Sequence, residues 1–283
     1  MDEKEEFMIK RQGNEVLSDR AKMVSIAKEN LNIFKNKSYT ALSGKSFDLS
    51  NDIDSAVNGT ILYKDTPITK QFSVSNTSLE VTNETTAHAG FRALQSGKDN
   101  IVVLNFASAR NPGGGFLSGA SCQEEDLCRA SALYACLKRK PMFYNENILC
   151  DNSLYTDNMI YSPDVPFFRN EYNLFIEEPF KLSIISAPAP NVRSLEIAED
   201  DLKDIFRRRI LQILQIAESH NHKTIILGAW GCGAFGNSPD LVASVFKESL
   251  KIIPAFEHVC FAVYDNKENE PTFSSFKDIL LKE

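Results

Sequence analysis

The 283-residue sequence contains no apolar run approaching the ~18 residues that a membrane span requires. Its first residues, MDEKEEFMIKRQ, are acidic, whereas a secretory signal begins basic and then turns apolar. We therefore expect no membrane partner. We also expect an intracellular protein, located in the cytoplasm or, if its source is eukaryotic, in the nucleus.

Positive charge is scarce as well. The chain has 31 Lys and Arg against 38 Asp and Glu, a net charge of -7 and a pI near 5.3. A protein that grips DNA mainly through its phosphates needs a basic face, so bulk DNA binding is excluded. The basic cluster FRRRI at 206–210 lies in a predicted helix beside acidic residues at 199–204. This pattern predicts a solvated helix face.

The sequence also lacks metal-binding patterns. Six cysteines at 122, 128, 136, 150, 232 and 260 include no CxxC pair, and four histidines form no HExxH pattern. The sequence thus predicts neither a zinc site nor a disulfide framework. We interpret the cysteines as small buried hydrophobes and expect no metal and no cofactor.

What is present indicates one folded domain. The chain is 43% hydrophobic and 24% charged, and no linker or internal repeat divides it. We predict a charged tail over 1–16 and a single domain over 17–283. This domain opens with an amphipathic helix over 18–37, capped by Ser18. The helix should place four apolar side chains roughly on one face: Met23, Ile26, Leu31 and Phe34.

Apolar strands and helices then alternate, which is typical of a largely parallel sheet covered on both faces. The predicted strands are 60–64, 68–76, 101–107, 182–189, 224–230 and 259–265. The predicted helices are 85–97, 123–139, 199–219, 239–251 and 272–281. The segment 141–180 has no clear period, and we interpret it as a long folded excursion that carries part of a site.

A first glycine loop, Gly113-Gly114-Gly115, follows the strand 101–107 and precedes a helix. Ligands bind at this position in open α/β sheets, beyond the carboxyl ends of the strands. A lone glycine there would indicate only a tight turn. Three together favour close approach of the backbone to an anion such as a diphosphate. The loop is neither a Walker A loop nor a GxGxxG fingerprint.

A second glycine loop, LGAWGCGAFGNSPD at 227–240, also joins a strand to a helix N-terminus. Ser238 and Pro239 are suited to cap and begin that helix, whose free amides and dipole favour a phosphate. We interpret Trp230 and Cys232 as core and Phe235, which lies between glycines, as a ring facing a ligand. Two such loops predict a dinucleotide-like ligand with a sugar at one end.

Two adjacent carboxylates lie between the loops, in SCQEED. Ser121 and Glu124 fit the S-x-x-E capping box that begins a helix, which leaves Glu125 without a structural explanation. Successive helical residues point ~100° apart, so the two glutamates are not an obvious facing pair of a retaining glycosidase. One of them would have to carry the proton transfer.

These residues resemble a known family. The run GGG, then seven residues, then QEE, with NFASARNP before and CRASALY after, resembles the compact bacterial-type branch of the poly(ADP-ribose) glycohydrolases. GAWGCGAFGN resembles that family's phosphate and ribose loop, and SDRAKMVSIAKENL and ISAPAPN resemble its N-terminal helix and a middle strand. The resemblance covers about residues 17–265, apart from 141–180. It implies a macrodomain-like three-layer α/β/α fold with a mixed central sheet and an N-terminal helical extension.

The resemblance implies hydrolysis of the ribose–ribose O-glycosidic bonds of poly(ADP-ribose), without a metal. Glu125 would act as general acid and then general base, while Glu124 and Gln123 bind the adjoining sugar. The diphosphate and Glu124 would keep the acid protonated by like-charge repulsion. Without a basic groove for a long polyanion, the enzyme should work mainly from the chain terminus and release ADP-ribose.

The resemblance also implies a set of binding residues. Asn105 or Asn111 would contact the terminal ribose, and Tyr264, less directly, the adenine. The glycine loops would hold the diphosphate and ribose through Gly113, Gly114, Gly115, Gly231, Cys232, Gly233, Ala234, Phe235, Gly236 and Asn237. The expected partners are poly(ADP-ribose), poly(ADP-ribosyl)ated proteins and ADP-ribose as product, and we expect a monomer.

Three alternatives remain open from the sequence. A macrodomain that binds ADP-ribose without cleaving it would lack the acid, whereas Glu125 is present. A hydrolase that removes single ADP-ribose units would use the same loops, so the sequence separates it poorly. A non-enzymatic scaffold would leave the two glycine loops and the paired glutamates unexplained.

Overall fold

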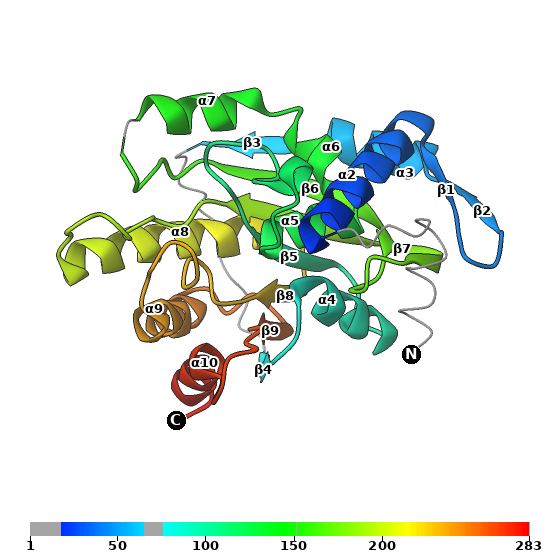
Figure 1. Cartoon of the computed structure of the whole chain (residues 1–283). Coiled ribbons are helices and arrows are strands. Elements are labelled where there is room, and N and C mark those ends of the chain that lie inside the picture. Colours follow the sequence, from blue (N-terminus) through cyan, green and yellow to red (C-terminus); the bar gives the residue numbers. More distant parts are fainter. Residues whose placement is uncertain (1–17, 65–75, 151, 283) are drawn as a thin grey trace.

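The computed structural model describes residues 18–64, 76–150 and 152–282. Within them, seven strands form one mixed sheet in the order β3-β6-β7-β5-β8-β9-β4 (Figure 1). The strands β7, β5, β8, β9 and β4 pair in parallel, and β6 pairs antiparallel with both of its neighbours. The sheet strands are β3 Ile61–Tyr63, β4 Ser78–Thr82, β5 Ile101–Phe106, β6 Met159–Arg169, β7 Phe175–Ala187, β8 Thr224–Leu227 and β9 His258–Ala262.

Side chains of the central strand alternate between two hydrophobic cores. In β5, Ile101 and Val103 pack into one core, while Val102 and Leu104 pack into the other. This alternation follows from the two-residue period of a strand, and the apolar run 101–104 of β5 reflects burial on both faces.

Helices cover both faces of the sheet, so the predicted three-layer α/β/α arrangement is confirmed. The first core is covered by α2 Asp19–Asn36, α3 Ser50–Gly59, α4 Thr86–Gln95, α5 Gln123–Ala130, α6 Leu133–Leu137 and α7 Pro141–Leu149. The second is covered by α8 Glu199–Ser219, α9 Pro239–Ile252 and α10 Pro271–Leu281. A separate hairpin pairs β1 Ser38–Thr40 with β2 Ser46–Asp48. Among the residues described, no helix is both long and apolar enough to cross a membrane.

The predicted helix 123–139 is two helices, α5 and α6. Ser131 between them is extended and forms a β-bridge to Phe167, and the N–H of Ala132 donates to the Pro166 carbonyl. Pairing with β6 therefore breaks the helix at a point where the local sequence favours continuation.

Other chain segments also differ from prediction. The segment 141–180 is not an excursion, because it forms α7, β6 and the start of β7 in the antiparallel part of the sheet. The strand β4, the β1–β2 hairpin and α3 were not predicted. The strand predicted at 68–76 falls mostly on residues 65–75, and the tail at 1–16 entirely, outside the described residues.

Several predicted surface and core assignments are wrong. Leu31 is partly exposed, and the buried face of α2 carries Ala27, Asn30 and Ile33. Arg209 is only 1% exposed because it pairs with Asp157, so the basic cluster is not wholly a solvated face. The six cysteines are free, but only those at 128, 136 and 260 are fully buried, and Cys122 is exposed.

The first helix is fastened to the sheet by a buried amide. Asn30 donates from Nδ2 to the carbonyls of Cys128, at 3.2 Å, and Arg129, at 2.7 Å, near the end of α5. Its Oδ1 accepts from Arg169 Nε of β6 at 3.0 Å. One side chain thus links three elements.

We predict that Asn30→Ala lowers the free energy of unfolding by about 2–3 kcal/mol, because it leaves buried donors and acceptors without partners. Urea denaturation measures the loss. The control is Asn32→Ala on the exposed side of the same helix, which should change stability by less than about 0.5 kcal/mol. Equal losses in both variants would contradict the linking role of Asn30.

Candidate active site

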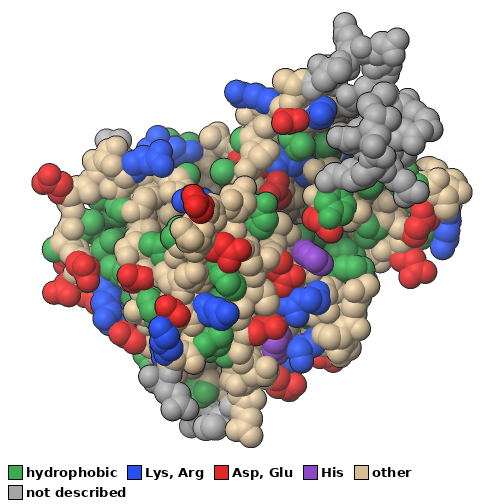
Figure 2. All heavy atoms as spheres, turned by 60° about the horizontal axis from the view of Figure 1, so that its bottom comes forward, with side chains coloured by type: hydrophobic (Ala, Val, Ile, Leu, Met, Phe, Trp, Pro, Cys, Tyr) green, Lys and Arg blue, Asp and Glu red, His purple; other side chains and the backbone are tan. Residues whose placement is uncertain are grey.

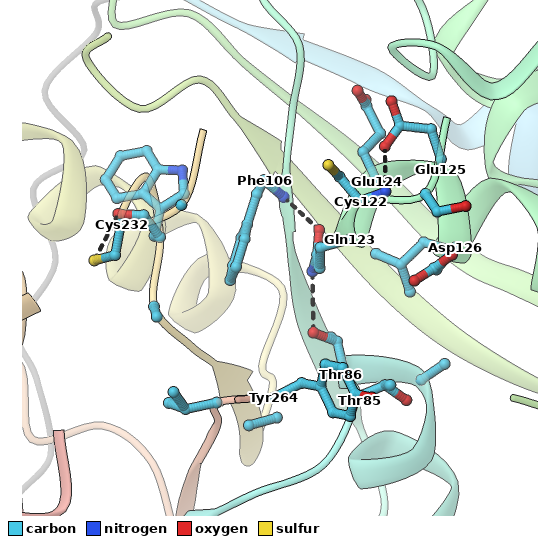
Figure 3. A pocket seen from close by; sticks show the side chains of 18 of the residues that line it. Thr85, Thr86, Phe106, Cys122, Gln123, Glu124, Glu125, Asp126, Cys232 and Tyr264 are labelled. Carbon is cyan, nitrogen blue, oxygen red and sulfur yellow. Dashed lines mark hydrogen bonds between the residues drawn. The ribbon is translucent and has the colours of Figure 1, made fainter. Parts of the chain in front are cut away.

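A cavity of about 570 Å³ opens at the carboxyl ends of the parallel strands. Its walls come from the segments that follow β4, β5, β7, β8 and β9, from α5, and from the turn between β6 and β7 at 170–173. The segment 141–180 thus contributes to the cavity, as predicted. In Figure 3, Gln123, Glu124 and Glu125 lie on one side and Cys232 on the other, with the ring of Phe106 between them. The fold thus collects residues from distant parts of the sequence at one edge of the sheet.

Glu125 is held by two backbone N–H groups. Its Oε1 accepts from Gly115 at 2.7 Å, and its Oε2 accepts from Cys122 at 3.1 Å. The second bond belongs to a capping box in which Cys122 is the N-cap and Glu125 the third helical residue. The predicted box of Ser121 and Glu124 is therefore wrong by one position.

The glycine triplet allows this carboxylate to approach. Gly114 has φ of +55°, and a Cβ placed on it would lie 2.4 Å from Glu125 Oε1. The N–H groups of Gly114 and Gly115 donate inside the protein, to the Asn111 carbonyl and to Glu125. The triplet hence accommodates a carboxylate of the protein itself.

Glu124 is the more deeply buried of the two carboxyl groups. Its Oε1 accepts from Asn105 Nδ2 at 3.1 Å, and its Oε2 accepts from the Ser108 N–H at 2.8 Å. Burial raises the pKa of Glu124 to about 8 and outweighs these two hydrogen bonds, which lower it. Near neutral pH this carboxyl group is therefore mostly protonated.

Gln123 uses its side-chain amide to join three elements. Its Oε1 accepts from the Phe106 N–H at 2.8 Å, and its Nε2 donates to Thr86 Oγ1 at 3.0 Å (Figure 3). The Nε2 also donates to the Leu104 carbonyl at 2.7 Å. These bonds fix the first turn of α5 against the end of β5 and the start of α4.

The second glycine loop presents backbone donors. Within the described chain, the N–H groups of Gly233, Ala234 and Phe235 have no hydrogen-bond acceptor, and all three residues line the cavity. Asn237 fixes the conformation of the loop by donating from Nδ2 to the carbonyls of Pro190, at 2.8 Å, and Gly231, at 2.9 Å. Donors at the mouth of a helix suit an anion.

The structure brings most, but not all, of the predicted site residues to the cavity wall. Those lining it are Gln123, Glu124, Glu125, Gly231, Cys232, Gly233, Ala234, Phe235 and Tyr264. Those that do not line it are Asn105, Asn111, Gly113, Gly114, Gly115, Gly236 and Asn237. Several of this second group support the wall instead, because they hydrogen-bond to or pack beside residues in it. Asn105, for example, is fully buried beneath Glu124.

Other lining residues were missed by the sequence analysis. They include Glu84, Thr86, Phe106, Ser108, Asp265 and Lys267. Phe106 lies near the end of the predicted strand 101–107, and Ser108 follows that strand. Their position at the strand's carboxyl end, next to the glycine loop, could have placed them at the site. Residues 84–86 follow β4, which was not predicted, and therefore gave none.

The cavity wall is acidic. In the parts of the chain that the structure describes, its acidic side chains are Glu84, Glu124, Glu125, Asp126, Glu171 and Asp265, and its basic side chain is Lys267. On the described part of the face drawn in Figure 2, acidic and basic side chains are intermingled. Among the described residues, no group of three His, Cys, Asp or Glu is placed to hold a metal ion. An anion bound here would rely on backbone N–H groups.

The chain is similar to known proteins over most of its length. The family model "Microbial-type PARG, catalytic domain" matches residues 27–170. The structure of poly(ADP-ribose) glycohydrolase from Thermomonospora curvata, bound to the inhibitor ADP-HPD, is 37% identical with a TM-score of 0.85, covering 91% of this chain and 98% of that one. The enzyme from Deinococcus radiodurans in complex with ADP-ribose is 36% identical with a TM-score of 0.73, covering 81% and 96%. No curated protein sequence matches.

The macrodomain-like fold and these comparisons define a hydrolase of the glycosidase class. The chain belongs to the microbial-type poly(ADP-ribose) glycohydrolase family.

The raised pKa of Glu124 predicts a pH-dependent stability. The pKa of Glu124 is 4.5 in the unfolded chain and about 8 in the folded protein. The stabilising contribution of this carboxyl group is therefore complete below pH 4.5 and is lost as the pH rises through 8. Between pH 5 and 8, wild type should lose about 3 kcal/mol more than Glu124→Gln, which cannot titrate. Urea denaturation across this range gives both curves, and parallel curves would contradict the prediction.

Proposed function

We propose that this chain hydrolyses the ribose–ribose bonds of poly(ADP-ribose) on modified proteins inside the cell, working mainly from the chain terminus and releasing ADP-ribose. The observation that carries this proposal is the placement of Glu125 and the unpaired amides of 233–235 in one cavity. A diphosphate on the amides would bring the attached sugar to the carboxyl group. The ADP-ribose and ADP-HPD complexes of family members support such a ligand.

In this proposal Glu125 transfers its proton to the departing ribose oxygen as the glycosidic bond breaks. The remaining sugar passes through an oxocarbenium-like state, and the Glu125 carboxylate then takes a proton from the attacking water. Gly115 and Cys122 each donate to a different oxygen of Glu125, which fixes the direction of the carboxyl group. Orientation of this kind is part of the catalytic effect.

Neutral Glu124 suits an anionic ligand. A full negative charge on Glu124 would repel the diphosphate, and burial removes that charge near neutral pH. The like-charge repulsion predicted from Glu124 is therefore weak at that pH. Its protonated state also makes Glu124 the second candidate for the general acid. Against this role, both of its oxygens already hydrogen-bond to Asn105 and Ser108.

The proposed reaction is tested by brief digestion of long poly(ADP-ribose), followed by sizing of the products. Early accumulation of free ADP-ribose with slowly shortening chains is expected, because Lys267 is the one basic side chain among the described residues of the acidic wall that could attract further units of the polymer. An early burst of mid-length oligomers would refute action from the terminus. Binding of ADP-ribose without any cleavage would refute the hydrolase.

We predict that Glu125→Gln lowers kcat by about 10²–10⁴-fold and leaves ADP-ribose affinity within about tenfold, since the amide cannot donate the same proton. Glu124→Gln should lose less activity. Single-turnover kinetics with calorimetric titration measures both effects. If Glu124→Gln is the more damaging change, Glu124 is the acid.

Gly114→Ala should also abolish most of the activity, because its Cβ would displace the Glu125 carboxyl group. We expect kcat to fall by about 10²-fold or more, the size of a general-acid contribution. The matched control is Gly97→Ala: Gly97 has φ of +80° but open space around its Cβ position. Both variants should lose melting temperature from backbone strain, and Gly114→Ala should lose more because its Cβ overlaps the buried Glu125 carboxyl group. Equal activity in the two variants would show that Gly114 is not needed to position Glu125.

A further inference from the structure

A buried guanidinium supports the wall of the cavity from behind. Arg209 of α8 is 1% exposed, and its Nε donates to Asp157 Oδ1 at 2.6 Å. Its Nη1 donates to the Pro188 carbonyl at 3.0 Å, and its Nη2 donates to the carbonyls of Leu154, at 2.6 Å, and Tyr155, at 3.0 Å. Arg209 therefore holds two separate segments, one of which leads into Ala189 of the cavity wall.

The segment around Tyr155 is fixed on its other sides as well. The N–H groups of Leu154 and Tyr155 donate to Asn152 Oδ1, and Thr156 donates to Asn147 Oδ1 through both N–H and Oγ1. Tyr155 has φ of +63°, which is uncommon for a non-glycine residue and persists where the surroundings determine it. The position of its ring is thus imposed by the fold.

That ring packs against Phe235 of the second glycine loop. The two ring centroids are 6.2 Å apart with an interplanar angle of 49°. On the backbone side, the Val192 N–H donates to the Phe235 carbonyl at 3.0 Å, and the neighbouring Asn191 N–H donates to Ser153 at 2.8 Å. Phe235 lines the cavity beside the unpaired amides of its loop. Phe235 is partly buried and also packs against the second hydrophobic core, so the Tyr155 ring is one of its supports.

We propose that Tyr155 and Arg209 are positioning residues for substrate binding: Arg209 fixes the backbone of Tyr155, and the Tyr155 ring holds Phe235 against the terminal ADP-ribose unit. This inference rests on the proposed function. It assigns to α8, on the far side of the sheet from Glu125's helix, a part in recognising the ligand.

The test variant is Tyr155→Gly, which removes the ring and relieves the left-handed backbone, so that folding is not impaired. The KM for polymer and the Kd for ADP-ribose should rise about 3- to 10-fold, in the range of one aromatic contact, with a much smaller fall in kcat. Tyr155→Phe keeps the ring and should restore wild-type affinity. Asn221→Gly, at φ of +61° in the turn before β8, controls for the backbone change and should leave affinity unaltered.

The outcomes separate this inference from the proposed function. If wild type cleaves the polymer and Tyr155→Gly binds ADP-ribose equally well, the positioning role is overturned and the hydrolase stands. A loss of kcat without a change in KM would also overturn it. If wild type neither binds ADP-ribose nor cleaves the polymer, both proposals fall.

Discussion

The burial of two adjacent carboxyl groups against backbone N–H groups is the constraint on which the rest of the site depends. Glu125 needs the Gly115 and Cys122 amides, and Glu124 needs the Ser108 amide. These donors come from the loop after β5 and from the helix start, so the strand, the glycine triplet and α5 must meet with little freedom. A buried carboxyl group without such partners would cost several kcal/mol.

Two amide side chains hold α5 in place against the neighbouring helices and strands. Gln123 fastens α5 to β5 and α4, and Asn30 fastens the end of α5 to α2 and β6. Each of these groups is hydrogen-bonded to backbone as well as to side chains. Such fully satisfied buried networks restrict a fold to one arrangement, whereas apolar packing alone tolerates small shifts. Precise placement of a carboxyl group benefits from that restriction.

Anion recognition in this acidic cavity depends on backbone N–H groups and not on cationic side chains. The wall has several carboxylates and one lysine, so attraction by cations is weak. The unpaired amides of the second glycine loop supply partial positive charge at short range, and burial keeps Glu124 largely neutral at pH 7. Backbone recognition of this type favours one diphosphate held closely over many held loosely, which accords with action at a chain terminus.

The sequence alone determined the parallel strands and covering helices at 101–107 and from 182 onward, the two glycine loops and the QEE run, because periodicity and loop composition are local properties. Tertiary structure decided the capping register at Cys122, the break at Ser131 and the burial of Arg209. It also directed the amides of Gly115 to Glu125 and left those of 233–235 open to the cavity. Each of these features depends on a hydrogen-bond partner distant in sequence, which no local pattern specifies.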